Sequence, residues 1–131
     1  MKHVLFVCVE NSCRSQMAEG FARKFGGDVV EAHSAGSRPS GVVNPKAIAA
    51  MKDVDIDLSE HESHGFDELP EREWDTVVTM GCGEACPFIP AKQRLDWDLS
   101  DPAQMPPDQF NKVRDEIRTR VEQLIKALRK E

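Results

Sequence analysis

The chain has 131 residues, a length that predicts a single domain spanning 1–131 with a substantial hydrophobic core. Its residues are 40% hydrophobic and 31% charged, as in ordinary soluble proteins, and no apolar run approaches the roughly 18 residues that a membrane-spanning helix needs. The net charge of -6 argues against nucleic acid as a partner. The N-terminus reads as a core strand rather than a signal peptide, so we expect a cytoplasmic protein, and a monomer.

Strand and helix patterns alternate along the chain. Short apolar runs rich in β-branched and aromatic residues predict strands at 3–7, 28–36, 75–80 and 93–97. Apolar residues at helical spacing predict helices at 16–25 and 45–51, a short turn at 65–69 and a long helix at 110–128. Asn44 suits the cap of the second helix, since Pro45 follows at the first helical position. This order predicts an α/β fold in which a parallel sheet is covered on both faces.

The junction between the first strand and the first helix carries the sequence Cys8-x5-Arg14-Ser15. Such a junction points backbone N–H groups into the loop, and the helix dipole favours an anion there. A helix N-terminus and a nearby cation lower the pKa of a cysteine, and the Ser15 hydroxyl can donate to its thiolate. Arg14 offers a planar fork of donors that suits two oxygens of a tetrahedral oxyanion. We therefore predict a pocket for phosphate, sulfate or arsenate in which Cys8 is the nucleophile.

The backbone of the loop is expected to surround the oxyanion. The loop residues are Val9, Glu10, Asn11, Ser12, Cys13 and Arg14. Asn11 tolerates a left-handed turn, and its amide can bond the loop backbone. A structural Cys8 beside an Arg14 that only caps the helix is the simpler alternative, but the surrounding strand, the helix and Ser15 favour catalysis.

A second pair of cysteines, Cys82 and Cys86, follows the third predicted strand. In a parallel sheet this segment lies at the same edge as the Cys8 loop, beyond the carboxyl ends of the strands. Cys-x3-Cys is also half of a conceivable zinc site, but no second pair of cysteines or histidines has suitable spacing, so we expect no metal. His61 and His64 lie in a polar stretch and are expected on a solvated face. The four cysteines therefore predict thiol reactivity rather than a disulfide scaffold.

Residues 7–20 resemble the corresponding segment of the low-molecular-weight tyrosine phosphatase superfamily, and Asn-Ser-Cys-Arg-Ser-Gln-Met-Ala-Glu at 11–19 is similar to its arsenate reductase branch. The resemblance continues through 33–36, 77–82 and 96–102 and covers nearly the whole chain. It implies a three-layer fold with a four-stranded parallel sheet and helices on both faces. It also implies an enzyme that reduces arsenate to arsenite, with phosphate or sulfate as competing oxyanions.

The resemblance further implies how the cysteines act. Cys8 attacks arsenate, Cys82 attacks the sulfur of the thiol–arsenic adduct and releases arsenite, and Cys86 then attacks Cys82. Thioredoxin or a similar protein reduces the resulting disulfide, so no tightly bound cofactor is expected. Well-known members have a longer spacing between the two relay cysteines than the three residues between Cys82 and Cys86. The short spacing is similar to that of reductases that use a low-molecular-weight thiol, such as mycothiol, with a glutaredoxin-like partner; of the two, we favour the intramolecular relay.

Departure of hydroxide from arsenate needs a proton donor. Asp101 stands in a late loop, where Pro102 favours an extended backbone at the aspartate, and the resemblance assigns the general acid to this Asp-Pro pair. Asp96 and Asp98 are the alternatives in the same segment. Asp101 is also the candidate to take a proton from an incoming thiol.

The related phosphatases also suggest roles for three residues around the loop. Cys13 either forms a protective disulfide with Cys8 under oxidation or is a small loop residue with no redox role. Ser34 and Glu19 either brace the loop or bind a potassium ion, as in some relatives, or they simply satisfy local hydrogen bonds, and of these we favour the local hydrogen bonds.

The alternative enzyme is a low-molecular-weight protein tyrosine phosphatase. That family usually carries aromatic residues beside its Asp-Pro pair, whereas Ala103 and Gln104 stand there in this chain, which has no tyrosine. A third reading is a non-catalytic oxyanion or redox sensor built on Cys8 and Cys13. It predicts binding or oxidation without turnover, and it leaves Asp101 without a role.

Overall fold

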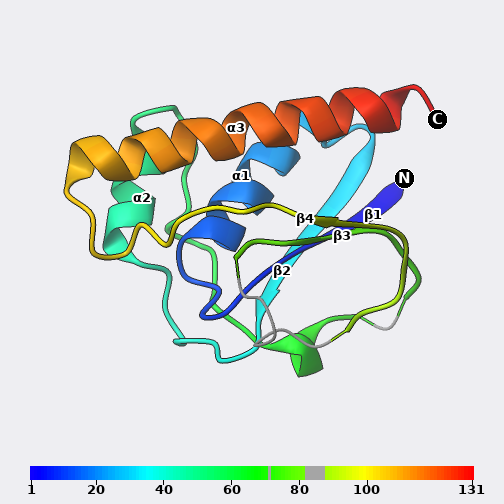
Figure 1. The fold of residues 1–131 in the computed structure, drawn as a ribbon, viewed down its shortest axis with the longest axis horizontal. Helices are drawn as coiled ribbons and strands as arrows, with labels where there is room; N and C mark the ends of the chain where they lie inside the picture. Colours follow the sequence, from blue (N-terminus) through cyan, green and yellow to red (C-terminus); the bar gives the residue numbers. More distant parts are fainter. Residues whose placement is uncertain (71, 82–87) are drawn as a thin grey trace.

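The computed structural model describes residues 1–70, 72–81 and 88–131, and helices and strands alternate along it (Figure 1). In chain order the elements are β1 (Lys2–Cys8), α1 (Arg14–Gly26), β2 (Val30–Gly36), α2 (Pro45–Lys52), the 3-10 turn η1 (Phe66–Glu68), β3 (Trp74–Thr79), β4 (Ala91–Asp96) and α3 (Pro107–Arg129). Every element that the sequence predicts is present, with bounds shifted by a few residues. The predicted cap is also confirmed, since the Asn44 side chain accepts a hydrogen bond from the amide of Lys46 at 2.9 Å.

The strands form one parallel sheet in the order β2-β1-β3-β4. The chain moves to one side of β1 to form β2 and then returns to the other side to form β3. The topological switch point, where open α/β sheets bind ligands, therefore lies at the carboxyl end of β1. Cys8 is the last residue of β1, and Gly81 follows β3 at the same end of the sheet.

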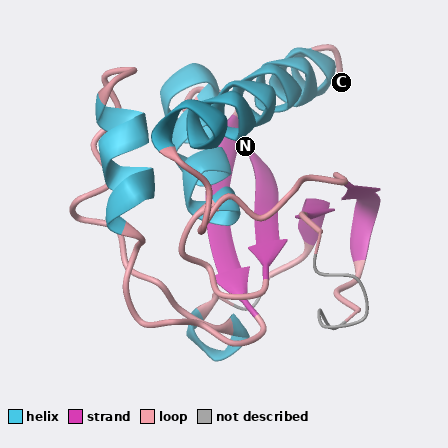
Figure 2. Ribbon diagram, turned by 60° about the vertical axis from the view of Figure 1, so that its left-hand side comes forward, coloured by secondary structure: helices cyan, strands magenta, loops and turns pink. Residues whose placement is uncertain are grey.

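The larger core lies between one face of the sheet and the three α-helices (Figure 2). Val4 and Phe6 of β1 are buried in one cluster with Met17 and Phe21 of α1. The stripe predicted for the C-terminal helix completes this core, and its buried residues are Phe110, Val113, Ile117, Val121, Leu124, Ile125 and Leu128. Because α1 is held between the sheet and α3, the direction of its N-terminus, and hence the aim of the Cys8 loop, is fixed by packing.

The opposite face of the sheet has a smaller core. Its buried members are Leu5, Val7, Ala35, Trp74 and Val77. The connecting segments cover them with Phe66, Leu69 and Ile89. Because crossovers between parallel strands are right-handed, the β2–β3 connection is expected on this face. Among the described residues, however, η1 is the only helical turn that covers the face. Ile56 and Leu58 of the same connection pack into the larger core instead. The predicted class, an α/β fold with a four-stranded parallel sheet, is confirmed.

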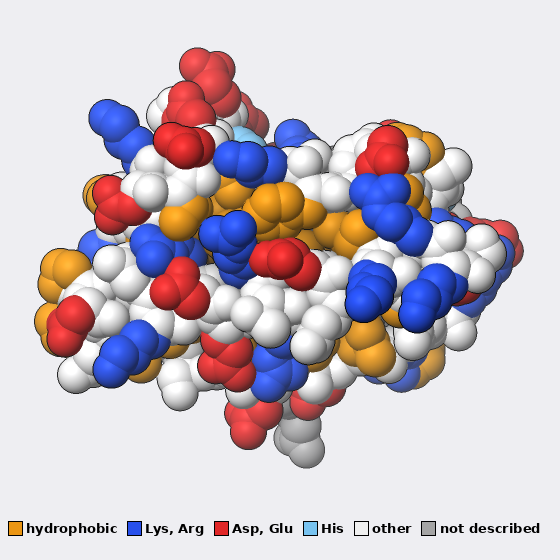
Figure 3. Space-filling view, turned by 90° about the horizontal axis from the view of Figure 1, so that it is seen from above, with side chains coloured by type: hydrophobic (Ala, Val, Ile, Leu, Met, Phe, Trp, Pro, Cys, Tyr) orange, Lys and Arg blue, Asp and Glu red, His pale blue; other side chains and the backbone are white. Residues whose placement is uncertain are grey.

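The outer surface over α3 carries charged side chains of both signs in mixture (Figure 3). Two ion pairs join residues that are one helical turn apart: Arg118 with Glu122 at 2.9 Å, and Arg120 with Glu116 at 3.1 Å. A helix face of this kind is typical of contact with water. None of the described helices is long and apolar enough to cross a membrane.

Candidate active site

The loop between β1 and α1 is held from one side by the segment that follows β2. Four backbone amides of residues 37–44 donate to four carbonyls of residues 8–12, at 2.8 to 3.3 Å. In contrast, the amides of residues 9–13 donate to no described residue. The loop therefore turns its carbonyls towards the protein and keeps a set of uncommitted N–H groups, which is the arrangement that binds an oxyanion.

Gly36 belongs to this arrangement because the loop passes close to its backbone. A Cβ atom at Gly36 would lie 2.5 Å from the carbonyl oxygen of Val9 and 2.9 Å from the amide nitrogen of Asn11. Only glycine at the end of β2 lets the loop pass this near to the sheet. The glycine at the end of segment 33–36 thus has a steric reason.

Asn11 fixes the shape of the loop from within. It has a φ of 52°, the left-handed conformation predicted for it, and it is fully buried. Its Oδ1 accepts hydrogen bonds from Gln16 Nε2 at 2.9 Å and from the amide of His64 at 3.0 Å, and its Nδ2 donates to Ser15 Oγ at 2.8 Å. These bonds offset the strain of the positive φ and tie the loop to both α1 and the segment before η1.

Cys8 and Ser15 lie in contact behind the loop. The sulfur of Cys8 is 2.8 Å from Ser15 Oγ, and both residues are buried. Because Asn11 already donates to the Ser15 oxygen, the hydroxyl hydrogen of Ser15 is left for the sulfur. The site thus supplies a donor to a Cys8 thiolate, as the sequence predicts.

Arg14 is held in place by residues that sequence reasoning missed. Its Nη1 donates to the carbonyl oxygen of Leu99 at 3.0 Å. Gly81, which has a φ of +77°, packs against the guanidinium so closely that a Cβ there would lie 2.6 Å from Nη1. A glycine directly after the third strand was the available signal for this contact, whereas nothing local marks Leu99.

These residues line a cavity of about 540 Å³ at the carboxyl end of the sheet. Its lining consists of Cys8, Val9, Glu10, Ser12, Cys13, Arg14, Arg38, Gly81 and Asp101. Of the predicted site residues, Asn11 and Ser15 are buried and belong to the hydrogen bonds behind the loop, and Cys82 and Cys86 lie outside the described residues. Arg38 is the charged lining residue that the sequence did not indicate.

The structure separates the three candidate proton donors. Asp101 lines the cavity, and its Oδ1 accepts a hydrogen bond from the amide of Ala103 at 3.1 Å, which fixes the turn around Pro102. Asp96 instead accepts from the hydroxyl of Thr79 at 2.8 Å. Neither Asp96 nor Asp98 lines the cavity.

Cys13 lies in the loop, and burial decides its electrostatic state. Burial raises the pKa of the Cys13 thiol to about 11, against a lowering by the hydrogen bond from Ser12, and Asp101 and Cys8 raise it further. Cys13 is therefore a neutral thiol at physiological pH, which makes it a poor nucleophile and a slow partner for disulfide formation.

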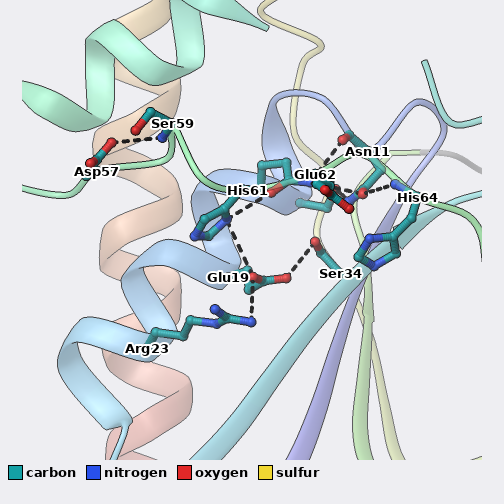
Figure 4. Close-up of polar contacts among 11 residues, drawn as sticks. Asn11, Glu19, Arg23, Ser34, Asp57, Ser59, His61, Glu62 and His64 are labelled. Carbon is teal, nitrogen blue, oxygen red and sulfur yellow. Dashed lines mark hydrogen bonds and ion pairs between the residues drawn. The ribbon is translucent and has the colours of Figure 1, made fainter. Parts of the chain in front are cut away.

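A buried carboxylate lies on the second turn of α1 (Figure 4). Glu19 accepts a hydrogen bond from Ser34 Oγ at 2.8 Å and pairs with Arg23 at 3.0 Å and with His61 Nδ1 at 3.5 Å. Ser34 lies on β2, so this network ties α1 to the sheet beneath the loop. The local hydrogen bond expected for Glu19 and Ser34 is therefore present.

His61 is a correction, because the sequence placed it on a solvated face. Its side chain is only 14% exposed, and its Nδ1 lies 3.1 Å from Gln16 Oε1. Since Gln16 Nε2 donates to Asn11, Gln16 Oε1 is the acceptor and His61 Nδ1 carries the hydrogen. Desolvation by burial lowers the pKa of His61, against an opposing effect of the Glu19 carboxylate, so the ring is neutral at pH 7.

Comparison with known proteins gives a consistent result. The family model described as low molecular weight phosphotyrosine protein phosphatase matches residues 3–131. Arsenate reductase 2 of Staphylococcus epidermidis is 46% identical over 125 residues, which are 92% of this chain and 94% of the relative. A solved structure of an arsenate reductase in the phosphate-binding state superposes with a TM-score of 0.88 at 39% identity, covering 98% of this chain and 99% of the other. A thioredoxin-dependent arsenate reductase of Corynebacterium glutamicum has a TM-score of 0.78 at 30% identity, over 98% of this chain and 62% of its own.

Proposed function

This chain belongs to the low-molecular-weight phosphotyrosine protein phosphatase family and to the arsenate reductases within it, and we propose that it reduces arsenate to arsenite with Cys8 as the nucleophile. One observation carries the proposal. Cys8, Arg14 and four residues of the loop whose amides donate to no described residue (Val9, Glu10, Ser12 and Cys13) line one cavity. An oxyanion bound there has its central atom in front of a thiolate.

In the first chemical step the Cys8 thiolate attacks arsenic and forms a sulfur–arsenic bond. The departing hydroxide takes a proton from the Asp101 carboxyl and leaves as water. Arg14 and the amides of residues 9–13 stabilise the negative charge on the arsenate oxygens during the attack. Ser15 holds the thiolate through the hydroxyl hydrogen that faces the sulfur.

In the second step a thiol attacks the sulfur of Cys8. The electron pair of the sulfur–arsenic bond passes to arsenic, which is reduced and released as arsenite, and a disulfide forms. We assign this attack to Cys82, with Asp101 accepting its proton. Cys86 then attacks Cys82, returns Cys8 to the thiolate and leaves a Cys82–Cys86 disulfide.

The reductant that regenerates the dithiol is assigned by analogy. A thioredoxin-dependent enzyme is among the relatives, so we propose thioredoxin as the partner, with a low-molecular-weight thiol and a glutaredoxin-like protein as the other route. Both are found where thiols are kept reduced, so we propose that the enzyme acts in the cytoplasm. Phosphate and sulfate are expected to compete with arsenate for the loop.

Mass spectrometry after one turnover tests the scheme. Fully reduced enzyme is given arsenate without reductant, and free thiols are then blocked with iodoacetamide. We expect one arsenite per enzyme and a Cys82–Cys86 disulfide, while Cys8→Ser yields neither product and still binds phosphate. Cys13→Ser is the control, since its neutral thiol has no part in the scheme.

Other outcomes of this experiment separate the routes. Arsenite that forms only when a small thiol is added, with Cys82 and Cys86 still reduced, would replace the intramolecular relay by the small-thiol route. If arsenate oxidises no thiol in either system, the enzyme is not an arsenate reductase. The phosphatase alternative lacks an aromatic side chain among the described lining residues, and phosphate release from an aryl phosphate measures it directly.

A further inference from the structure

The cavity carries a second guanidinium, that of Arg38, which the chemistry above does not use. Four charged side chains line the cavity: Glu10, Arg14, Arg38 and Asp101. Arg14 is only 7% exposed and has one nitrogen committed to the Leu99 carbonyl. The Arg38 side chain, by contrast, is exposed and forms no ion pair or hydrogen bond with any other residue in the described ranges.

The backbone of Arg38 is fixed even though its side chain is not. Its amide donates to the carbonyl oxygen of Val9 at 2.8 Å, so the residue is attached directly to the anion-binding loop. Pro39 follows, and a proline restricts the backbone of the residue before it to extended conformations. The guanidinium therefore projects from a fixed point on the wall of the cavity.

The distribution of charge explains why a second cation is useful there. A tetrahedral anion seated on the loop turns some oxygens to the amides of residues 9–13, and the remaining oxygens face the mouth of the cavity. Glu10 also lines the cavity, so its carboxylate would offset the positive charge of a single guanidinium. The protein as a whole adds to this repulsion, since its net charge is -6.

We propose that Arg38 is a substrate-binding residue that captures the oxyanion at the mouth of the cavity and pairs with its outward oxygens. The proposal deepens the proposed function, on which its extension to arsenate rests, but phosphate has the same shape and charge and reports on Arg38 by itself. Exposed guanidinium–oxyanion attraction is screened by salt, so the contribution of Arg38 depends on ionic strength. Because Arg38 acts before the chemical step, it affects KM rather than kcat.

The test compares Arg38→Ala and Arg38→Lys with a matched control, Lys126→Ala. Lys126 is an exposed cation on the last turns of α3, and α3 ends near the start of β1, where Glu131 contacts Lys2, at the opposite end of the sheet from the cavity. The control removes the same unit of charge from the protein. The dissociation constant for inorganic phosphate is measured by calorimetry, and KM and kcat for arsenate are measured with saturating reductant.

For Arg38→Ala we expect the phosphate dissociation constant and the arsenate KM to rise by about three- to tenfold at low salt, with kcat within about twofold. Arg38→Lys should recover part of the loss, and Lys126→Ala should change little. The difference in phosphate affinity between Arg38→Ala and the wild type should shrink when salt approaches 0.5 M (roughly a 4 Å screening length).

An unchanged phosphate affinity in Arg38→Ala overturns the proposal, as does an equal effect of Lys126→Ala. A rise confined to the KM of the reductant also overturns it, because Arg38 would then contact the thiol. Weakened phosphate binding in a protein without reductase activity would leave Arg38 in place and remove the proposed function instead.

Discussion

The two sides of the active site are built in different ways. On the loop side, Asn11, Ser15 and Gln16 are buried and joined by hydrogen bonds of 2.8 and 2.9 Å. On the opposite side, Asp101 is exposed, and its segment is tied to the helices by Lys46, whose Nζ donates to the carbonyls of Ala103 at 3.0 Å and Met105 at 3.2 Å. A preorganised loop can bind an anion without rearranging, whereas a proton donor must meet water, substrate and thiol in turn. We therefore expect substitutions on the Asp101 side to change kcat and substitutions on the loop side to change the free energy of unfolding.

The largest effect is expected on the side of the site that carries the exposed Asp101. Asp101→Asn removes the proton donor, so kcat for arsenate should fall by about 10²- to 10⁴-fold. The amides and Arg14 that hold the anion are unchanged, so phosphate affinity should stay within about twofold. Asp98→Asn is the matched control, because Asp98 is exposed in the same segment and does not line the cavity. Equal losses in the two variants would show that Asp101 acts by charge alone, and an unchanged kcat would remove it as the acid.

The loop side should respond in stability. Asn11→Ala leaves the backbone amide of His64 without its acceptor, removes one of the acceptors of Gln16 Nε2, and places at a φ of 52° a residue that tolerates this conformation less well than asparagine. We therefore expect a loss of about 2–4 kcal/mol in the free energy of unfolding. Asn11→Gly loses the same hydrogen bonds without the backbone strain and should recover about 1 kcal/mol of that loss. Urea denaturation measures both. Equal midpoints for the two variants would mean that the positive φ carries no strain here.

Lys46 tests how far the Asp101 side of the site depends on its hydrogen bonds to α2. Lys46→Ala removes two hydrogen bonds to the segment after Asp101, so we expect kcat to fall by about two- to fivefold because the acid is less well positioned. Lys46→Arg should retain most of the rate. Stability should change by less than about 1 kcal/mol, since both bonds are exposed. A large loss of phosphate affinity would contradict this, because it would place Lys46 in anion binding.

Sequence reasoning succeeded where contacts are local. The Cys8 loop, its strand and its helix are contiguous, and the left-handed Asn11 follows from the residue type, so these features could be predicted together. Arg14 and Leu99 stand 85 residues apart, and their hydrogen bond exists only after β1 and β4 have joined the same sheet. His61 was placed wrongly for the same reason. A histidine in a polar stretch resembles a surface residue until the fold brings Glu19 and Gln16 against it.

The smallest expected effect concerns that histidine and the pH dependence of stability. Burial lowers the pKa of His61 in the folded protein, whereas the pKa of a histidine in the unfolded chain is about 6.5. Below that pH the unfolded chain binds a proton more readily than the folded one, so acidification favours unfolding. This contribution to stability is fully present above pH 6.5 or so and is lost as the pH falls through the folded pKa.

His61→Gln isolates this contribution, because glutamine can still donate to Gln16 but does not titrate. Glu19 and Asp57 attract a protonated ring while Arg23 repels it, so the net slope is modest. We expect the urea midpoint of the wild type to fall more between pH 7.5 and pH 5.5 than that of His61→Gln, with both proteins retaining phosphate binding. A steeper fall in His61→Gln would mean that the Glu19 carboxylate outweighs burial. The loop side of the site would then be stabilised by a charged pair rather than by a neutral hydrogen-bond network.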